Sequence, residues 1–183
     1  MRKRIVYWLA VIGVVLVLGF AGELFRGIIA SSVWHLRHGG SIVAGDYEIA
    51  LPRYWFVEST NGSVTQLARA HFPHTNETSF QSSATVSTLA KPVSDLQLWE
   101  SEEQRFYAKE GGTILRTLEV RLTPEQRIVC VEGELAREVL RIPSPHLVSA
   151  NCQANSRLNL MFTGTEGDFQ EFYSIVERLR IAH

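Results

Sequence analysis

The residues in this sequence best suited to chemistry are two histidines and a glutamate spaced three residues apart. His71, His74 and Glu77 form the pattern H-x-x-H-x-x-E in a polar stretch that follows an alternating segment. Two imidazoles and a carboxylate are ordinary zinc ligands, and Pro73 would stiffen the loop that carries them. A fourth ligand is not evident, and the spacing differs from the helical H-E-x-x-H motif of metalloproteases. The trio is a metal-site hypothesis, and its simpler alternative is a set of ordinary exposed loop side chains.

No other pattern predicts catalysis. The serines are not accompanied by a G-x-S-x-G or S-x-x-K motif. Glu132 and Glu134 share one face of an expected strand, but paired carboxylates need a cleft for acid–base work. An apolar stripe of Leu96, Trp99, Phe106 and Tyr107 is expected on a helix, and Glu103 lies beside it. The functional interpretation of Glu103 is a carboxylate with a raised pKa in a pocket. The simpler interpretation is a carboxylate that reaches water or an arginine. We therefore assign no catalytic residue and no cofactor.

Two segments are candidates for binding. The exposed turn Pro143-Ser144-Pro145 suits recognition of a protein partner, because proline lowers the entropy cost of ordering a loop. Its alternative is a stiff connection. The aromatic run Tyr54-Trp55-Phe56, with Trp99, could line an apolar ligand groove. Aromatic residues at such spacings are more often part of the core.

The first twenty-two residues predict a membrane anchor. A basic tail, residues 1–4, precedes eighteen uncharged residues at 5–22. As a helix these would rise about 27 Å, close to the roughly 30 Å hydrocarbon core of a bilayer. Basic residues stay on the cytoplasmic side, so we expect a single span with its N-terminus inside and the rest of the chain outside the cell (inner) membrane. Tyr7 and Trp8 would lie at the inner interface.

A cleaved secretory signal is the alternative interpretation of this segment. It has the same basic start, with a shorter apolar region and a small-residue exit. Gly19-Phe20-Ala21 is a weak version of that exit, and the chain stays apolar beyond it. The run length favours a retained anchor. Both interpretations place the domain outside the cytoplasm.

Charge excludes one class of partner. Residues 42–183 carry thirteen basic and eighteen acidic side chains, a net charge of −5. Nucleic-acid binding needs a clustered basic face to neutralise phosphates. We therefore expect no nucleic-acid partner.

Both cysteines, Cys130 and Cys152, lie in the part expected outside the cytoplasm. An even count in an oxidising compartment favours a disulfide. The alternative is two separate buried thiols, since free cysteine is among the most buried residue types.

The remaining pattern predicts a juxtamembrane helix, a link and one domain. Apolar residues recur at three- and four-residue spacing after Glu23, and Gly39-Gly40-Ser41 then supplies a short flexible link. Residues 23–41 are thus assigned as juxtamembrane helix and linker, and 42–183 as an extracytoplasmic domain.

The domain is predicted as α+β, a mostly antiparallel sheet with two packed helices. Its apolar alternation is typical of strands joined by hairpin-length turns, one of them at Asn61-Gly62. The helices are expected at Asp95–Glu110, where Ser94 would begin a capping box, and at Asp168–Arg180, where Asp168 would cap.

Part of this pattern resembles the PsbP-like superfamily. Tyr47-x-Ile49-x-Leu51-Pro52-x-x-Trp55 looks like its opening strand, and Phe162-x-Gly164 with Phe169-x-x-Phe172 is similar to its last strand and helix. The resemblance covers residues 42–183. It implies a non-enzymatic binding or assembly role and supplies no site residue.

These observations lead to one functional hypothesis and two rivals. The leading hypothesis is a membrane-anchored extracytoplasmic accessory or assembly protein that binds a protein partner within a membrane complex. The first rival is a metal-dependent envelope hydrolase that uses His71, His74 and Glu77. The second is a binder of small apolar ligands near Trp55.

Overall fold

The computed structural model describes residues 2–71, 82–134 and 147–182, with the backbone alone at 2–7, 9 and 10. Its four helices are α1 (Arg2–Leu24), α2 (Arg26–His38), α3 (Leu96–Lys109) and α5 (Glu166–Glu177). Its strands are β1 (Ser41–Ala44), β2 (Tyr47–Ala50), β3 (Trp55–Asn61), β4 (Val64–Arg69), β5 (Ser83–Thr88), β6 (Thr113–Arg121), β7 (Arg127–Glu134), β8 (Leu147–Ala154), β9 (Leu158–Thr165) and β10 (Arg180–Ile181). The α+β class is confirmed.

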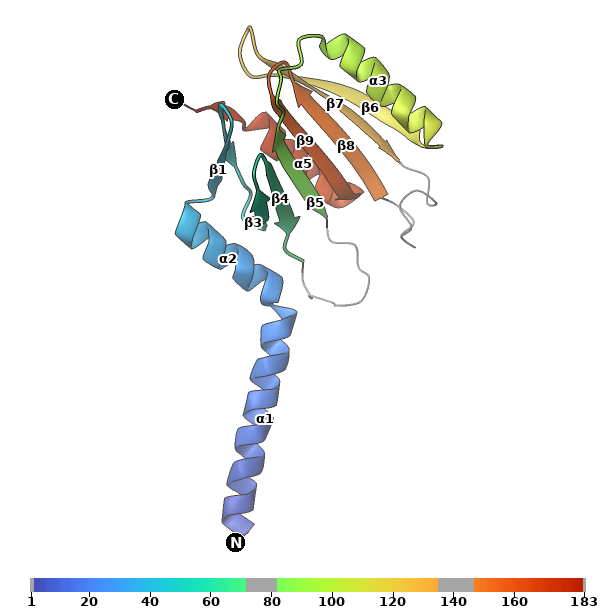
Figure 1. The fold of residues 1–183 in the computed structure, drawn as a ribbon. Coiled ribbons are helices and arrows are strands. Elements are labelled where there is room, and N and C mark those ends of the chain that lie inside the picture. Colours follow the sequence, from blue (N-terminus) through green and yellow to red (C-terminus); the bar gives the residue numbers. More distant parts are fainter. Residues whose placement is uncertain (1, 72–81, 135–146, 183) are drawn as a thin grey trace.

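Seven strands form one antiparallel sheet in the order β3-β4-β5-β9-β8-β7-β6. Helix α5 packs on one face, against β8 and β9, and α3 contacts β6, β7 and β8 on the other (Figure 1). Gly62, with φ 58°, makes the predicted turn between β3 and β4. The two predicted packed helices are thus present on opposite faces of the sheet.

The main core lies between the sheet and α5. Phe162 of β9 stacks on Phe172 of α5 with ring centroids 5.0 Å apart, and its edge meets Phe169. Trp55 of β3 is fully buried against the same cluster. These aromatic side chains supply much of the apolar area removed from water, the dominant favourable term in folding.

A second, three-stranded sheet was not expected. β2 lies between β1 and β10, both antiparallel to it. Tyr47 and Ile49 of β2 are buried in the main core, so this small sheet closes the side of the domain that lies next to α2 and the C-terminus (Figure 1). Two-residue β10 is too short to show an alternating pattern, which is why the sequence predicts one sheet instead of two.

Helix α2 is hydrogen-bonded to the domain. The Ser31 hydroxyl donates to the carbonyl of Arg53 (2.6 Å), and His35 Nε2 donates to the carbonyls of Pro52 (3.2 Å) and Trp55 (2.9 Å). After α2, Gly39 and Gly40 adopt left-handed conformations, φ 69° and 77°. Where we expect a flexible link, the structure has a tight turn.

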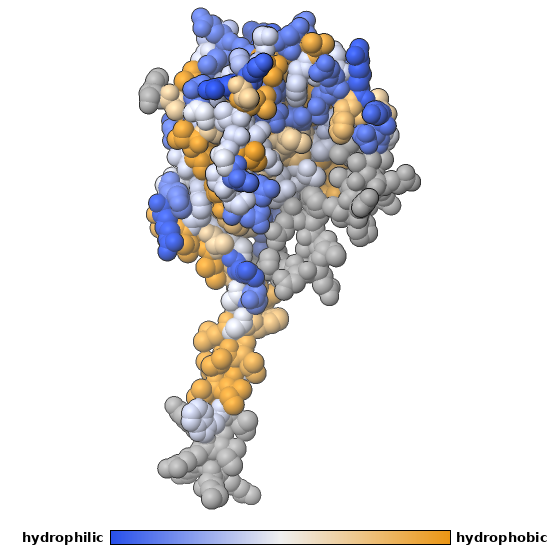
Figure 2. Space-filling view, viewed as in Figure 1, coloured by the Kyte–Doolittle hydropathy of each residue, from blue (hydrophilic) through white to orange (hydrophobic). Residues whose placement is uncertain are grey.

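Helix α1 extends away from the domain (Figure 1), and its residues 11–22 carry no polar side chain (Figure 2). Among the residues with described side chains, no single helix has the length and apolar character needed to cross a membrane. Val11–Leu24 and Arg26–His38 meet those two criteria only as a pair, bent by 68° at the break between them.

Three local expectations are corrected. The N-cap of α3 is Asp95, whose carboxylate accepts from the backbone N–H groups of Gln97 and Leu98, and not Ser94. Helix α5 already begins at Glu166, so Asp168 lies inside its first turn and is not the cap. Phe106, expected on the buried stripe of α3, is exposed.

Cys130 and Cys152 face each other on neighbouring strands. Their Cα atoms are register partners in the β7–β8 pair, and their Sγ atoms lie 2.09 Å apart, a disulfide distance. The pair lies in the core, where both side chains are fully buried.

Replacing both cysteines, Cys130→Ala with Cys152→Ala, should lower the free energy of unfolding by about 3 kcal/mol, because the cross-link restricts the unfolded chain. The measurement is the urea midpoint of the full-length protein in mild detergent. Reductant should lower the wild-type midpoint and leave that of the double variant unchanged. A wild-type midpoint that is insensitive to reductant would show that the thiols are not bonded.

Candidate functional site

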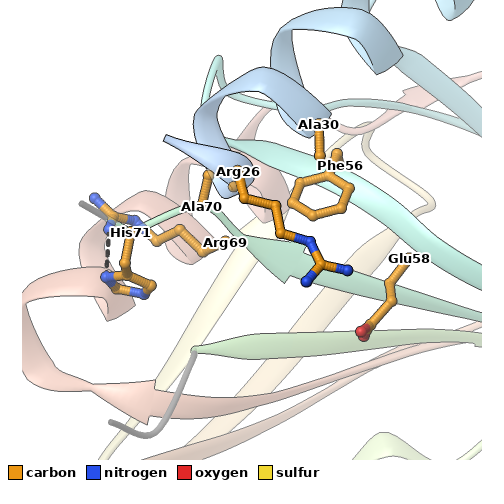
Figure 3. A pocket seen from close by; sticks show the side chains of 8 residues that line it. Arg26, Ala30, Phe56, Glu58, Arg69, Ala70 and His71 are labelled. Atoms are coloured by element: carbon orange, nitrogen blue, oxygen red, sulfur yellow. Dashed lines mark hydrogen bonds between the residues drawn. The ribbon is translucent and has the colours of Figure 1, made fainter. Parts of the chain in front are cut away.

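A cavity of about 350 Å³ lies where α2 meets the first strands of the large sheet (Figure 3). Its eight lining residues come from α2, from β3 and from the end of β4: Arg26, Gly27, Ala30, Phe56, Glu58, Arg69, Ala70 and His71. The volume falls in the range of small-molecule sites, roughly 300–1,000 Å³. Both apolar and charged groups line it, so it can bind a ligand of mixed character.

The cavity exists because α2 approaches β4 closely without filling the space beside it. Gly27 lies against Ala70: a Cβ on this glycine would be 3.4 Å from that of the alanine, in van der Waals contact. Phe56 lies on β3 next to buried Trp55 in the chain, so alternation points it to the opposite face of the sheet. Its ring then contributes to the cavity wall near Ala30.

Arg69 connects the cavity to an ionic cluster at the start of α5. Its Nε and Nη2 atoms each donate to a different oxygen of Glu171, both at 2.8 Å, and Nη1 lies 3.1 Å from Asp168 Oδ1. The bidentate geometry is the strong form of an arginine–carboxylate pair. Hydrogen bonding to Arg69 lowers the pKa of Glu171, against the opposing effect of partial burial. The carboxylate of Glu171 therefore stays ionised at neutral pH.

Asp168 is buried, and besides Arg69 it contacts Ser82. The Ser82 hydroxyl donates to Asp168 Oδ2 (2.5 Å), and its oxygen accepts from the backbone N–H of Thr165 (3.2 Å). Gly164 makes room for this serine, since a Cβ at that position would lie 2.2 Å from Ser82 Oγ. Ser82 is fully buried and serves the packing of α5; it is not available as a nucleophile.

His71 lies beside Arg69 as a neutral ring. Arg69 Nη1 donates to Nδ1 (3.3 Å), so the ring proton belongs on Nε2. Nε2 lies 3.5 Å from Asp168 Oδ2, at ion-pair range for a charged ring, yet makes no hydrogen bond within the described residues. Burial lowers the pKa of His71; the charge of Asp168 opposes this and Arg69 adds to it. We therefore treat the contact as one between a carboxylate and a neutral imidazole.

The metal hypothesis fits poorly with these neighbours. Among the described residues, no three His, Cys, Asp or Glu side chains are grouped so that they could hold a metal ion. At His71 the nearest charged group on the Nδ1 side is the guanidinium of Arg69, which would repel a cation. His74 and Glu77 lie outside the described residues, so their part of the hypothesis stays a prediction.

The other predicted positions are distributed as follows. Pro143, Ser144 and Pro145 lie outside the described residues. The side chain of Tyr7 is not described, and Trp8 is exposed on α1. Trp55 belongs to the core and its indole donates to Glu171 Oε2 (3.2 Å), whereas its neighbour Phe56 lines the cavity.

The three glutamates considered for acid–base chemistry, Glu132, Glu134 and Glu103, have different surroundings in the structure. Glu132 is buried on β7 and pairs with Arg116 of β6, whose guanidinium lies over the ring of Phe169. Glu134 is exposed at the strand end. Glu103 of α3 is half-buried, so its pKa is raised by burial, against the opposing hydrogen bond to Asn151. The simpler interpretation of Glu103, a carboxylate that reaches water or an arginine, did not include this hydrogen bond to Asn151 of β8.

Sequence reasoning missed Arg69, Asp168 and Glu171 as a group. One signal was present: Arg69 shares a strand face with Leu67, so it places a charge where alternation expects a core residue. A charge in such a position requires a buried partner. The partner is 102 residues away along the chain, in α5.

Comparison of the chain with protein-family models, curated proteins and solved structures finds no match. The resemblance to the PsbP-like superfamily therefore stays a prediction.

Gly164→Ala should lower the free energy of unfolding by about 2 kcal/mol, the usual cost of overpacking a core. The new methyl group would meet Ser82 and the ring of Phe162. Gly167→Ala in α5 is the matched control, because a Cβ there meets nothing within 4 Å. It should leave stability unchanged or raise it by up to about 0.5 kcal/mol. Equal urea midpoints for the two variants would contradict the tight packing around Ser82.

Glu171→Gln should destabilise the protein at pH 7 by about 2 kcal/mol, between the values for exposed and buried ion pairs. Since the pKa of Glu171 is lowered on folding, its contribution is complete above the unfolded value of about 4.3 and is lost as the pH falls through the folded value. The gap between variant and wild type should therefore close below about pH 4 in unfolding curves. Glu119→Gln, which breaks an exposed pair with Arg121, is the control and should change little at any pH.

Proposed function

We propose that this chain is a single-pass membrane protein whose extracytoplasmic domain binds a protein partner, as a non-enzymatic accessory or assembly factor. The observation that carries the proposal is the combination of an uncovered apolar helix, α1, with a second helix, α2, that is hydrogen-bonded to the domain. Such an arrangement suits a protein that must present one surface at a set position above a membrane.

The anchor is supported by the surface of α1. Leu16, Val17, Leu18 and Phe20 are each 66–69% exposed, although consecutive residues point to different sides of a helix. A helix that is apolar all round belongs in a protein core or in a bilayer. The eighteen uncharged residues at 5–22 have the length for a bilayer, and the basic tail at 1–4 favours a cytoplasmic N-terminus. The Cys130–Cys152 pair suits the oxidising compartment outside.

The hydrogen bonds of α2 fix the position of the domain relative to the proposed anchor. Ser31 and His35 hydrogen-bond backbone carbonyls on either side of Tyr54, so α2 and the edge of the sheet move together. Confinement near the membrane raises the effective concentration of the domain towards membrane-embedded partners. A set orientation also reduces the entropy lost when a partner binds.

The surface around α3 is the best candidate for the partner. Large apolar side chains are exposed on α3, on β6, which α3 contacts, and on β9, which pairs with β8 in the same sheet: Leu98, Phe106, Ile114, Leu115 and Met161. On its inner side α3 buries Leu96 and Tyr107, and the Tyr107 hydroxyl is hydrogen-bonded to that of Ser149. Apolar side chains on the outer surface of a helix are typical of residues that a binding partner covers.

Affinity purification of the full-length protein in mild detergent, after cross-linking in its native membrane, should recover a defined protein partner. The double variant Leu98→Glu with Phe106→Glu should lose it, because charged side chains are depleted at interface centres. Glu102→Gln, also exposed on α3, is the matched control and should retain the partner. Recovery of no partner, or equal recovery with all three proteins, would count against the proposed surface.

The same preparation separates the rivals. A stoichiometric metal ion that is lost on His71→Ala would favour the hydrolase, and co-purified apolar ligand without any protein would favour the ligand binder.

Protease added outside intact cells or spheroplasts should digest the domain. A fully protected domain would contradict the orientation.

A further inference from the structure

One face of α2 is apolar and exposed. Its side chains are between 41% and 86% exposed and recur at spacings of four and three residues: Ile29, Val33 and Leu36. At about 100° per residue they fall within an arc of roughly 60° on the helix surface. We call these three residues the apolar stripe.

The opposite face of α2 is the one held by the domain. Ser31 and His35 donate hydrogen bonds to the domain. On the helical wheel Ser31 points about 140–160°, and His35 about 100–160°, away from the residues of the apolar stripe. Trp34 packs on the same side against the core. The apolar stripe therefore faces away from the sheet.

Two arginines flank the stripe. Arg26 and Arg37 lie about 20° apart on the helical wheel, along one border between the stripe and the domain side. Both are exposed, and Arg26 makes only a long contact of 3.9 Å with Glu23. Cationic side chains along the border of an apolar helix face are typical of helices that lie in a membrane interface, where long side chains reach the phosphate groups.

The bend between the helices gives the orientation. Val11–Leu24 and α2 meet at 68°. If α1 runs along the bilayer normal, α2 lies about 20° from the membrane plane. A tilt of α1 by about 20°, which is usual for spanning helices, would bring α2 into that plane. A single residue separates α1 from α2, so the apolar stripe begins about one helical turn after α1 ends.

We propose that α2 lies in the outer membrane interface with its apolar stripe among the lipid chains and its arginines at the level of the headgroups. The proposal rests on the membrane anchor proposed above. It commits to lipid instead of a second copy of the chain, because a stable dimer buries roughly 800 Å² per partner, more than a stripe of three side chains on one helix provides. The domain at −5 is not attracted to anionic lipid, so apolar burial drives the contact.

This placement also orients the domain. Since α2 is bonded to the chain around Arg53 and Trp55, the β3 edge of the large sheet faces the bilayer. The cavity beside Arg26 then opens close to the headgroups. Helix α3, which lies at the other end of the domain from α1 in Figure 1, faces away from the membrane.

The test uses the full-length protein reconstituted in phosphatidylcholine vesicles. Single variants Ile29→Cys, Val33→Cys and Leu36→Cys receive a nitroxide label, and its collisions with oxygen and with a water-soluble nickel complex are compared. Oxygen concentrates in lipid and the nickel complex in water. The three labels should collide more with oxygen, whereas Met161→Cys, on the exposed side of β9, should collide more with nickel.

A further label distinguishes the failure of this inference from that of the anchor. Leu16→Cys in α1 should report the deepest lipid environment. If it does while the three α2 labels report water, the interfacial helix is wrong and the anchor stands. If Leu16→Cys itself reports water, the anchor proposal fails as well. Spin–spin broadening at Val33→Cys that vanishes on dilution with unlabelled protein would identify a second copy as the occupant and overturn the lipid assignment.

Discussion

The guanidinium of Arg69 is the group around which this domain is arranged. Strand β4 places it on the face of the sheet that carries the core, where an unpaired charge would be costly. Helix α5 supplies both compensating carboxylates from one face, Asp168 and Glu171, three residues apart. The position of α5 on the sheet is therefore set by charge compensation as well as by the stacking of Phe172 on Phe162.

This constraint extends to helix α2 through Trp55. The indole of Trp55 donates to Glu171, and its backbone carbonyl accepts from His35 of α2. One buried residue thus joins the ionic cluster, the edge of the sheet and the helix that leads to α1. Substitutions in the cluster would consequently affect how firmly the domain is held by α2, beyond their effect on the core.

Elements with a local sequence signature could be predicted from the sequence. The hairpin at Gly62, the helices α3 and α5 and the pairing of Cys130 with Cys152 each have a local signature or a simple compartment argument. The small sheet could not be predicted, because β10 is two residues long and its partner β2 lies at the opposite end of the domain sequence. Asp168 is a similar case: an acidic residue near a helix start is equally typical of a cap, and only tertiary contact with Arg69 and Ser82 separates the two roles.

The small sheet also affects when the domain can fold. β2 lies near the start of the domain in the sequence, and its partner β10 lies near the end. Tyr47 and Ile181 can therefore pair only after the chain between them has been synthesised. Contacts of such high sequence separation form late, because the entropy of closing the loop must be overcome first. The seven-stranded sheet contains neither β2 nor β10, so it can form before the small sheet is complete. The small sheet is therefore the part of the domain expected to close last.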